Sequence, residues 1–134
     1  MDTSINQLHL FRDAKDIKTY RPGEFIFKQG DPGDCLYVVK SGTVSLMHGD
    51  QVLESIGAGA MFGEMALLDN EQRSAAAVAT TECQVIPIDQ TRFRFLVQQT
   101  PFFAQHVMKV MAYRLRRLTS QLGGGGTERM VDSA

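Results

Sequence analysis

Short apolar runs separated by turn-forming residues constrain the fold of this chain more than any other feature. Between about Ile17 and Asp89, runs rich in Val, Ile, Phe and Tyr are each ended by Gly, Pro, Asp or Asn. Short runs with turns at this spacing are typical of an antiparallel barrel or sandwich. The strands predicted on this basis lie near residues 24–29, 35–40, 43–48, 51–56, 75–80 and 83–88.

The pattern becomes helical after Asp89, which is a plausible N-cap for a helix over residues 90–99. A second helix is predicted to begin at Thr100-Pro101 and to run to about Leu122, before Gly123. The fold class expected from both patterns is mainly β with flanking α-helices.

The second helix carries two apolar stripes. One stripe, formed by Phe103, Val107 and Val110, is suited to packing on the barrel. The other has the alternating spacing of four and three residues that is typical of a heptad seam. It consists of Ala104, Met108, Met111, Leu115, Leu118 and Leu122. Two stripes favour two partners, so we expect a homodimer through the 101–122 helix. The alternative is that both stripes belong to one intramolecular core.

Length and charge limit the remaining possibilities. The chain has 134 residues, enough for one domain, which we place at residues 1–122, with the barrel over about 17–89 and the C-terminal helices over about 90–122. A weak short-helix pattern precedes the barrel at residues 4–14, and a flexible Gly-rich tail is expected over 123–134. With 14 Lys+Arg against 15 Asp+Glu, the chain lacks the basic excess of proteins that bind nucleic acid backbones. No apolar run approaches the roughly 20 residues of a membrane span, and no signal peptide is recognisable, so we expect a cytoplasmic protein.

The residue types that hold metals or perform catalysis form no cluster in the sequence. Cys35 and Cys83 lie in predicted strands without metal-ligand spacing, so structural thiols are favoured over a disulfide or a metal pair. His9, His48 and His106 are scattered. The common hydrolase, metalloprotease and P-loop motifs are absent. We expect a binding protein rather than an enzyme, with no metal and no cofactor.

One segment does carry the chemistry of a ligand site. Residues 61–68 (MFGEMALL) place good helix formers directly after a glycine, so a short helix near Glu64 would present backbone N–H groups to an anion. Arg73 follows, and its guanidinium can grip a phosphate with two parallel bonds, while Ser74 adds a hydroxyl donor and the small side chains of residues 75–77 leave room. Because Glu64 needs a hydrogen-bond donor, a phosphorylated ribose fits this set. The alternative is a ligand-free Glu64–Arg73 salt bridge.

Two long segments resemble the cyclic nucleotide-binding domain family. Residues 23–42 (GEFIFKQGDPGDCLYVVKSG) look like the first signature of the family, and residues 62–68 (FGEMALL) followed by 73–75 (RSA) look like its phosphate-binding cassette. The resemblance covers about residues 10–120 and is strongest to catabolite-activator-like regulators and to the sensor domains of channels and kinases. It implies a jelly-roll β-barrel with a short cassette helix and C-terminal helices.

The resemblance also implies a role for individual residues. Arg73 would pair with the cyclic phosphate, and Glu64 would accept a hydrogen bond from the ribose 2′-hydroxyl. Gly63 and the N–H groups after it would line the phosphate end, and Ser74 would donate to a phosphate oxygen. The ligand-binding residues implied are Gly63, Glu64, Met65, Ala66, Arg73, Ser74, Ala75, Arg114 and Thr119.

The long helix bears on which base is bound. By the resemblance, Arg114 falls near the base, although a solvated helix-face charge is the alternative. Thr119 falls at a purine-contacting position that is often supplied by the partner subunit. Leu118 departs from the threonine that reads adenine in activator-like members, which puts adenine recognition in doubt. Ser74 is compatible with both cAMP and cGMP, so cAMP is the first ligand expected and cGMP the alternative.

Neither a DNA-binding module nor a membrane span is visible in the sequence, so we expect no direct DNA binding. The function expected is that of a stand-alone cyclic nucleotide sensor, which signals through its C-terminal helix to a dimer mate or to an unknown downstream protein. Two alternatives stay open at this point. One is an interaction module that kept the fold and lost the ligand, and the other is a small-molecule enzyme of the cupin type.

Overall fold

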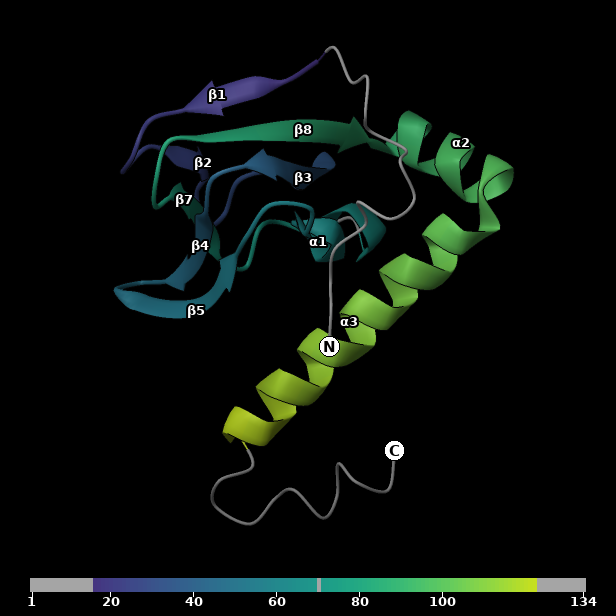
Figure 1. The fold of residues 1–134 in the computed structure, drawn as a ribbon. Coiled ribbons are helices and arrows are strands. Elements are labelled where there is room, and N and C mark those ends of the chain that lie inside the picture. Colours follow the sequence, from purple (N-terminus) through teal and green to yellow (C-terminus); the bar gives the residue numbers. More distant parts are fainter. Residues whose placement is uncertain (1–15, 70, 123–134) are drawn as a thin grey trace.

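Two antiparallel four-stranded sheets and three helices make up the computed structural model, which describes residues 16–69 and 71–122 (Figure 1). The sheet orders are β1-β8-β3-β6 and β2-β7-β4-β5. The strands are β1 (Lys18–Tyr20), β2 (Phe25–Phe27), β3 (Cys35–Ser41), β4 (Val44–His48), β5 (Gln51–Ile56), β6 (Met61–Phe62), β7 (Ala76–Ala79) and β8 (Cys83–Asp89). The helices are α1 (Glu64–Asp69), α2 (Gln90–Gln99) and α3 (Pro101–Leu122). The predicted fold class, mainly β with flanking helices in a jelly-roll arrangement, is confirmed.

Each of the six predicted strands is present, within two residues at either end. The sequence pattern missed β1 and β6, which have only three and two residues. β6 forms because Met61 and Phe62 pair with Val38 and Tyr37 in the middle of β3. This pairing brings the chain across the barrel directly before α1, and it therefore fixes where the cassette helix begins.

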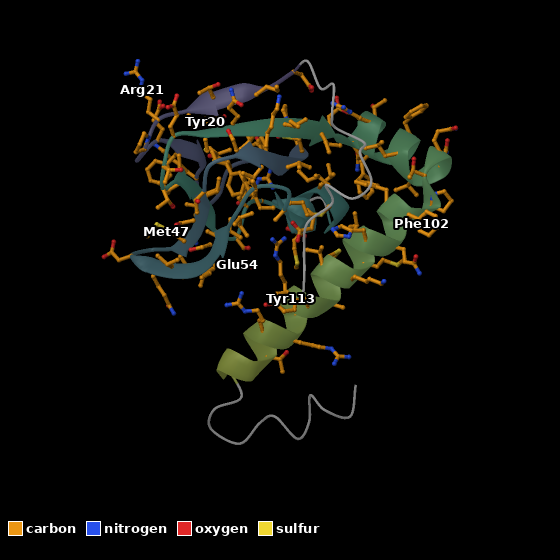
Figure 2. The ribbon with its side chains drawn as sticks, viewed as in Figure 1. Tyr20, Arg21, Met47, Glu54, Phe102 and Tyr113 are labelled. Atoms are coloured by element: carbon orange, nitrogen blue, oxygen red, sulfur yellow. The ribbon has the colours of Figure 1, made fainter. Side chains whose placement is uncertain are left out.

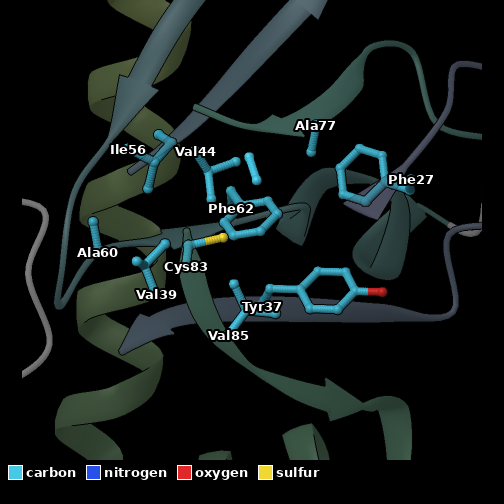
Figure 3. Close-up of a cluster of buried hydrophobic side chains, with 11 residues drawn as sticks. Phe27, Tyr37, Val39, Val44, Ile56, Ala60, Phe62, Ala77, Cys83 and Val85 are labelled. Atoms are coloured by element: carbon cyan, nitrogen blue, oxygen red, sulfur yellow. The ribbon is translucent and has the colours of Figure 1, made fainter. Parts of the chain in front are cut away.

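The core between the two sheets contains side chains from both of them (Figure 3). Three aromatic rings dominate one end of it, with centroid distances of 6.0 Å between Phe27 and Tyr37, 5.9 Å between Phe27 and Phe62, and 5.2 Å between Tyr37 and Phe62. Because these rings come from β2, β3 and β6, they hold together the strands around the cassette segment.

The helices begin where the sequence predicts them to begin. The Asp89 carboxylate accepts a hydrogen bond of 2.8 Å from the backbone N–H of Arg92, which confirms Asp89 as the N-cap of α2. On α3, the stripe of Phe103, Val107 and Val110 is buried against barrel residues, as predicted.

The second stripe of α3 divides between core and solvent. Met111 packs against the buried cluster, whereas 63% of Met108 and 50% of Leu115 are exposed. The alternative in which both stripes form one intramolecular core therefore does not hold for Met108 and Leu115. The side chains of Leu118 and Leu122 lie outside the described part of the structure.

The helix expected over residues 4–14 and the tail expected over 123–134 also lie outside the described residues. Among the residues that are described, no helix is both long enough and apolar enough to cross a membrane.

Candidate ligand-binding site

A cavity of about 290 Å³ lies at the cassette segment. This volume is close to the lower end of the roughly 300–1,000 Å³ typical of small-molecule sites. Eight of the nine predicted ligand-binding residues line it: Gly63, Glu64, Met65, Ala66, Arg73, Ser74, Ala75 and Arg114. Thr119 is half-buried on α3 and is not among the lining residues. The remaining walls, which sequence reasoning did not identify, are Phe27, Leu46, Glu71 and Gln72.

Arg73 is buried at the cavity wall, with 4% of its surface exposed. Its Nη1 donates a hydrogen bond of 2.7 Å to the carbonyl oxygen of Gly63, and its Nη2 donates to the carbonyl oxygen of Cys35. The guanidinium carbon lies 4.1 Å from the ring centroid of Phe27 and 5.9 Å from that of Tyr37. Carbonyl dipoles and aromatic faces therefore stabilise the positive charge without neutralising it.

Arg73 keeps hydrogen-bonding capacity for a ligand. Its Nε is buried and has no partner within the described structure, and no carboxylate there forms an ion pair with Arg73. The alternative of a Glu64–Arg73 salt bridge is therefore wrong. A buried N–H group without an acceptor is costly, and a phosphate oxygen would satisfy it.

Gly63 is required at its position for two reasons. Its φ of 82° lies in the left-handed region, and an added Cβ would stand 2.8 Å from Nη1 of Arg73. Any side chain at residue 63 would displace the guanidinium. Gly63 therefore allows both the sharp turn into α1 and the close approach of Arg73.

Gly33 positions α1 from outside the cavity. Its φ is not in the left-handed region, so the lack of space, and not the backbone conformation, excludes a side chain at this position. A Cβ at Gly33 would stand 2.1 Å from the Cβ of Ala66. The loop before β3 thus packs directly against the cassette helix.

Glu64 is bound by an arginine from α3 rather than by Arg73. Only 1% of Glu64 is exposed, and its Oε1 accepts a hydrogen bond from Nη1 of Arg114. Arg114 also donates from Nε to Oε1 of Glu54 at 3.1 Å, and from Nη2 to the carbonyl oxygen of Met61. One guanidinium therefore joins β5, β6, α1 and α3.

Two carboxylates keep Arg114 charged despite its burial. Burial by itself lowers the pKa of the guanidinium, but Glu64 and then Glu54 outweigh burial and raise that pKa above its ordinary value. The alternative of a solvated helix-face charge at Arg114 is wrong, because only 8% of the residue is exposed.

The sequence contains a signal for this burial. Arg114 continues the buried stripe of α3, since it follows Val107 by seven residues and Val110 by four. Glu54 has a weaker signal. It is an acidic residue in a strand, paired with Leu46 of β4, and its partner on α3 is 60 residues away in the sequence.

The two cysteines are free thiols. Cys35 is half-buried in β3, and Cys83 is buried in β8. Burial raises the pKa of both thiols, which keeps them protonated at neutral pH. Over residues 16–69 and 71–122, no three His, Cys, Asp or Glu side chains come together in a way that could hold a metal ion.

Comparison with known sequences identifies the family. Residues 17–100 match the sequence model of the cyclic nucleotide-binding domain. The chain belongs to the cyclic nucleotide-binding domain family. The matched region contains every residue of the cavity wall except Arg114, which α3 contributes from beyond it.

Relatives of this cyclic nucleotide-binding domain occur in bacteria and fungi. The chain is 36% identical over 110 residues to the cyclic AMP receptor protein of Thermus thermophilus, covering 78% of the chain and 51% of that protein. It is 38% identical over 90 residues to a cAMP-dependent protein kinase regulatory subunit of Eremothecium gossypii, covering 67% of the chain and 20% of the subunit. The crystal structure of the Thermus thermophilus catabolite activator protein superposes with a TM-score of 0.76 at 33% identity, covering 89% of the chain and 58% of that structure. The chain thus spans about half the length of these bacterial regulators.

Proposed function

We propose that this chain is a sensor that binds a cyclic nucleotide in the cavity at the cassette, with cAMP as the first ligand and cGMP as the alternative. The observation that carries the proposal is the state of Arg73 at the cavity wall. This arginine is 4% exposed, it forms no ion pair within the described residues, and its Nε lacks a partner. Such a group is poised for an anion, and membership of the family supports a cyclic phosphate.

The rest of the cavity suits a sugar and a base. Arg114 positions Glu64 by donating to its Oε1, and a Glu64 oxygen can accept a hydrogen bond from a ribose hydroxyl. Ser74 follows Arg73, is exposed and lines the same cavity, so its hydroxyl can donate to a phosphate oxygen. The apolar walls formed by Leu46, Met65 and Phe27 leave a surface for a purine. The regulators and kinase subunits among the relatives are named for cAMP, which supports cAMP as the first ligand.

The output of the sensor would be binding rather than catalysis, transmitted through α3. Arg114 contacts the cassette from α3, and Leu115, the next residue, exposes an apolar side chain together with Met108. A ligand that reorders Glu64 would change the contacts of Arg114 and thereby the position of α3. The exposed apolar stripe then serves a dimer mate or a separate protein.

Calorimetric titration with cAMP, cGMP and 5′-AMP tests the binding site. The unchanged chain is expected to bind a cyclic nucleotide at micromolar concentration or tighter and to reject 5′-AMP. Arg73→Ala should lose about 1.5–3 kcal/mol of binding free energy, or roughly tenfold to a hundredfold in affinity. Arg94→Ala removes the same charge from an exposed position of α2 outside the cavity and should bind normally.

Arg73→Lys separates loss of charge from loss of geometry, because lysine keeps the charge and lacks the planar fork. We expect intermediate affinity for this variant. Absence of heat with either cyclic nucleotide would contradict the proposal and would favour an interaction module that lost its ligand. Equal affinities for Arg73→Ala and the unchanged chain would remove Arg73 from the site.

Sedimentation velocity and hydrogen exchange test transmission through α3. Ligand is expected to change either the sedimentation coefficient or the exchange of residues 101–122. Met108→Glu and Leu115→Glu should abolish any self-association, whereas Gln105→Glu at an exposed polar position should not. If ligand alters neither measurement, α3 does not transmit binding.

A further inference from the structure

We infer that Glu54 makes the cavity selective for nucleotides with a single phosphate charge, by keeping Arg114 from serving as a second phosphate-binding cation. This inference rests on the proposed function, since it concerns which phosphorylated ligands the same cavity accepts. It assigns to Glu54 a role in specificity, although Glu54 is not itself among the residues that line the cavity.

The two arginines at the cavity differ in what holds them. Arg73 has only carbonyl oxygens as acceptors, so its charge is available to an anion. Arg114 is held by two carboxylates, with Glu54 binding through both of its oxygens at 3.1 Å from Nε and 3.5 Å from Nη2. With Nη1 on Glu64 and Nη2 also on the Met61 carbonyl, every nitrogen of Arg114 has an acceptor.

Glu54 reaches Arg114 from a separate part of the fold. It lies on β5 where that strand faces α3 (Figure 2). Its side chain is 14% exposed, and that of Arg114 is 9% exposed, so solvent screens their interaction only weakly. The β4–β5 hairpin therefore supplies a fixed negative charge behind the cavity wall.

The buried charges at the cavity balance before any ligand binds. Among the buried groups, Arg73 and Arg114 contribute two positive charges and Glu64 and Glu54 contribute two negative ones, while the exposed Glu71 adds a further carboxylate and no cation to the wall. A cyclic phosphodiester brings one negative charge, which Arg73 can neutralise. A terminal phosphate brings about −1.5 to −2 at neutral pH, and its second charge finds no available cation.

The cavity is small enough for the difference in phosphate charge to affect binding. A sphere of about 290 Å³ is roughly 8 Å across, which is about one Debye length at physiological salt. Because Arg114 lines this cavity and Glu54 lies 3.1 Å from its Nε, a phosphate in the cavity interacts with both groups. Because a Coulomb energy is proportional to the ligand charge, removal of the Glu54 charge should improve the binding of a dianion about twice as much, in logarithmic units, as that of a monoanion.

The test compares the affinities of 5′-AMP and cAMP, measured by displacement of a fluorescent cyclic nucleotide from the full chain. In Glu54→Gln we expect the preference for cAMP over 5′-AMP to fall by about tenfold. Glu54→Asp keeps the charge on a shorter side chain and should retain most of the preference, which a purely structural role of Glu54 would not predict. Glu82→Gln makes the same charge change at an exposed position between β7 and β8 and should leave the preference unchanged.

A second measurement needs no variant. The methyl ester of 5′-AMP is linear but carries a single charge, so the unchanged chain should bind it about tenfold more tightly than 5′-AMP. Two results would overturn the inference while cAMP binding stands. One is equal affinity of the unchanged chain for the two linear ligands. The other is a preference for cAMP over 5′-AMP in Glu54→Gln that lies within twofold of the preference of the unchanged chain. A chain that binds no cyclic nucleotide at all would overturn the proposed function and this inference together.

Discussion

Replacement of Arg114 by methionine would remove the cation that three parts of the fold share. Methionine retains an unbranched apolar stem and the helix propensity of arginine, so the change removes chiefly the guanidinium. The variant leaves Glu64 as a carboxylate with 1% exposure and without its cation. Breaking a buried ion pair by removing one partner costs about 3–5 kcal/mol, and we expect Arg114→Met to lose this much stability.

The two carboxylates should contribute unequally to that loss. The side chain of Glu54 is 14% exposed and can recover some hydration, whereas that of Glu64 is 1% exposed and cannot. Replacement of Glu64 by glutamine removes the uncompensated charge. The Arg114→Met change should therefore cost about 1–3 kcal/mol less in a Glu64→Gln background than in the unchanged chain. Glu54→Gln should reduce the cost by less.

Urea unfolding of the full chain at pH 7 measures these differences, with the slope of the transition checked for constancy. Arg116→Met, at an exposed position of the same helix, is the control and should stay within about 0.5 kcal/mol of the unchanged chain. The reasoning is refuted if Arg114→Met costs less than about 1 kcal/mol, or if Glu64→Gln fails to reduce its cost.

Three further changes test the packing, a titrating core residue and a helix end. Gly33→Ala should destabilise the chain by about 1–3 kcal/mol in urea unfolding, and it should cost less in an Ala66→Gly background than in the unchanged chain, because the 2.1 Å contact with the Ala66 Cβ is then removed; an equal cost in both backgrounds would contradict that contact. Burial, followed by the hydrogen bond with Cys35, raises the pKa of Tyr37 from 10.0, so this tyrosine stabilises the fold below pH 10, and that contribution falls by about 1.4 kcal/mol per pH unit above it. Tyr37→Phe should flatten the decline of stability between pH 10 and 11, and an unchanged slope would count against this assignment. Asp89→Ala should cost about 1 kcal/mol in thermal unfolding by removing the cap of α2, and an unaltered melting temperature would show that the cap contributes nothing.

Most of the fold could be predicted from the sequence because its signals are local. Turn residues mark the ends of most strands of four residues or more, and Asp89 and Pro101 mark the helix starts. β1 and β6 were not predicted because their two or three residues show no repeating pattern and their pairing with β8 and β3 is tertiary. The equally short β2 was predicted because its three residues, Phe25–Phe27, form an uninterrupted apolar run between turn residues.

In the candidate site, too, the local features were predicted from the sequence and the long-range contacts were not. Residues 63–66 and 73–75 are contiguous, so their chemistry was visible, and the structure brings them to one cavity. The sequence did not predict which cation binds Glu64. Arg114 lies 50 residues away, and Arg73 was an alternative cation for the same carboxylate. Spacing made Arg73 the nearer candidate, whereas the fold gives Arg73 the carbonyls of Gly63 and Cys35 instead.

The position of Arg114 along α3 determines how a displacement at Arg114 compares with the displacement at the end of the helix. α3 runs as one helix from Pro101 to Leu122, starting at the corner with α2 (Figure 1). At 1.5 Å per residue, Arg114 lies about 20 Å from that corner and the last residue lies about 32 Å from it. If the helix swings as a rigid rod about its first turn, a shift of about 1 Å at Arg114 becomes about 1.6 Å at the far end. In such a rotation, the far end of α3 would move farther than Arg114, the residue that contacts the cassette.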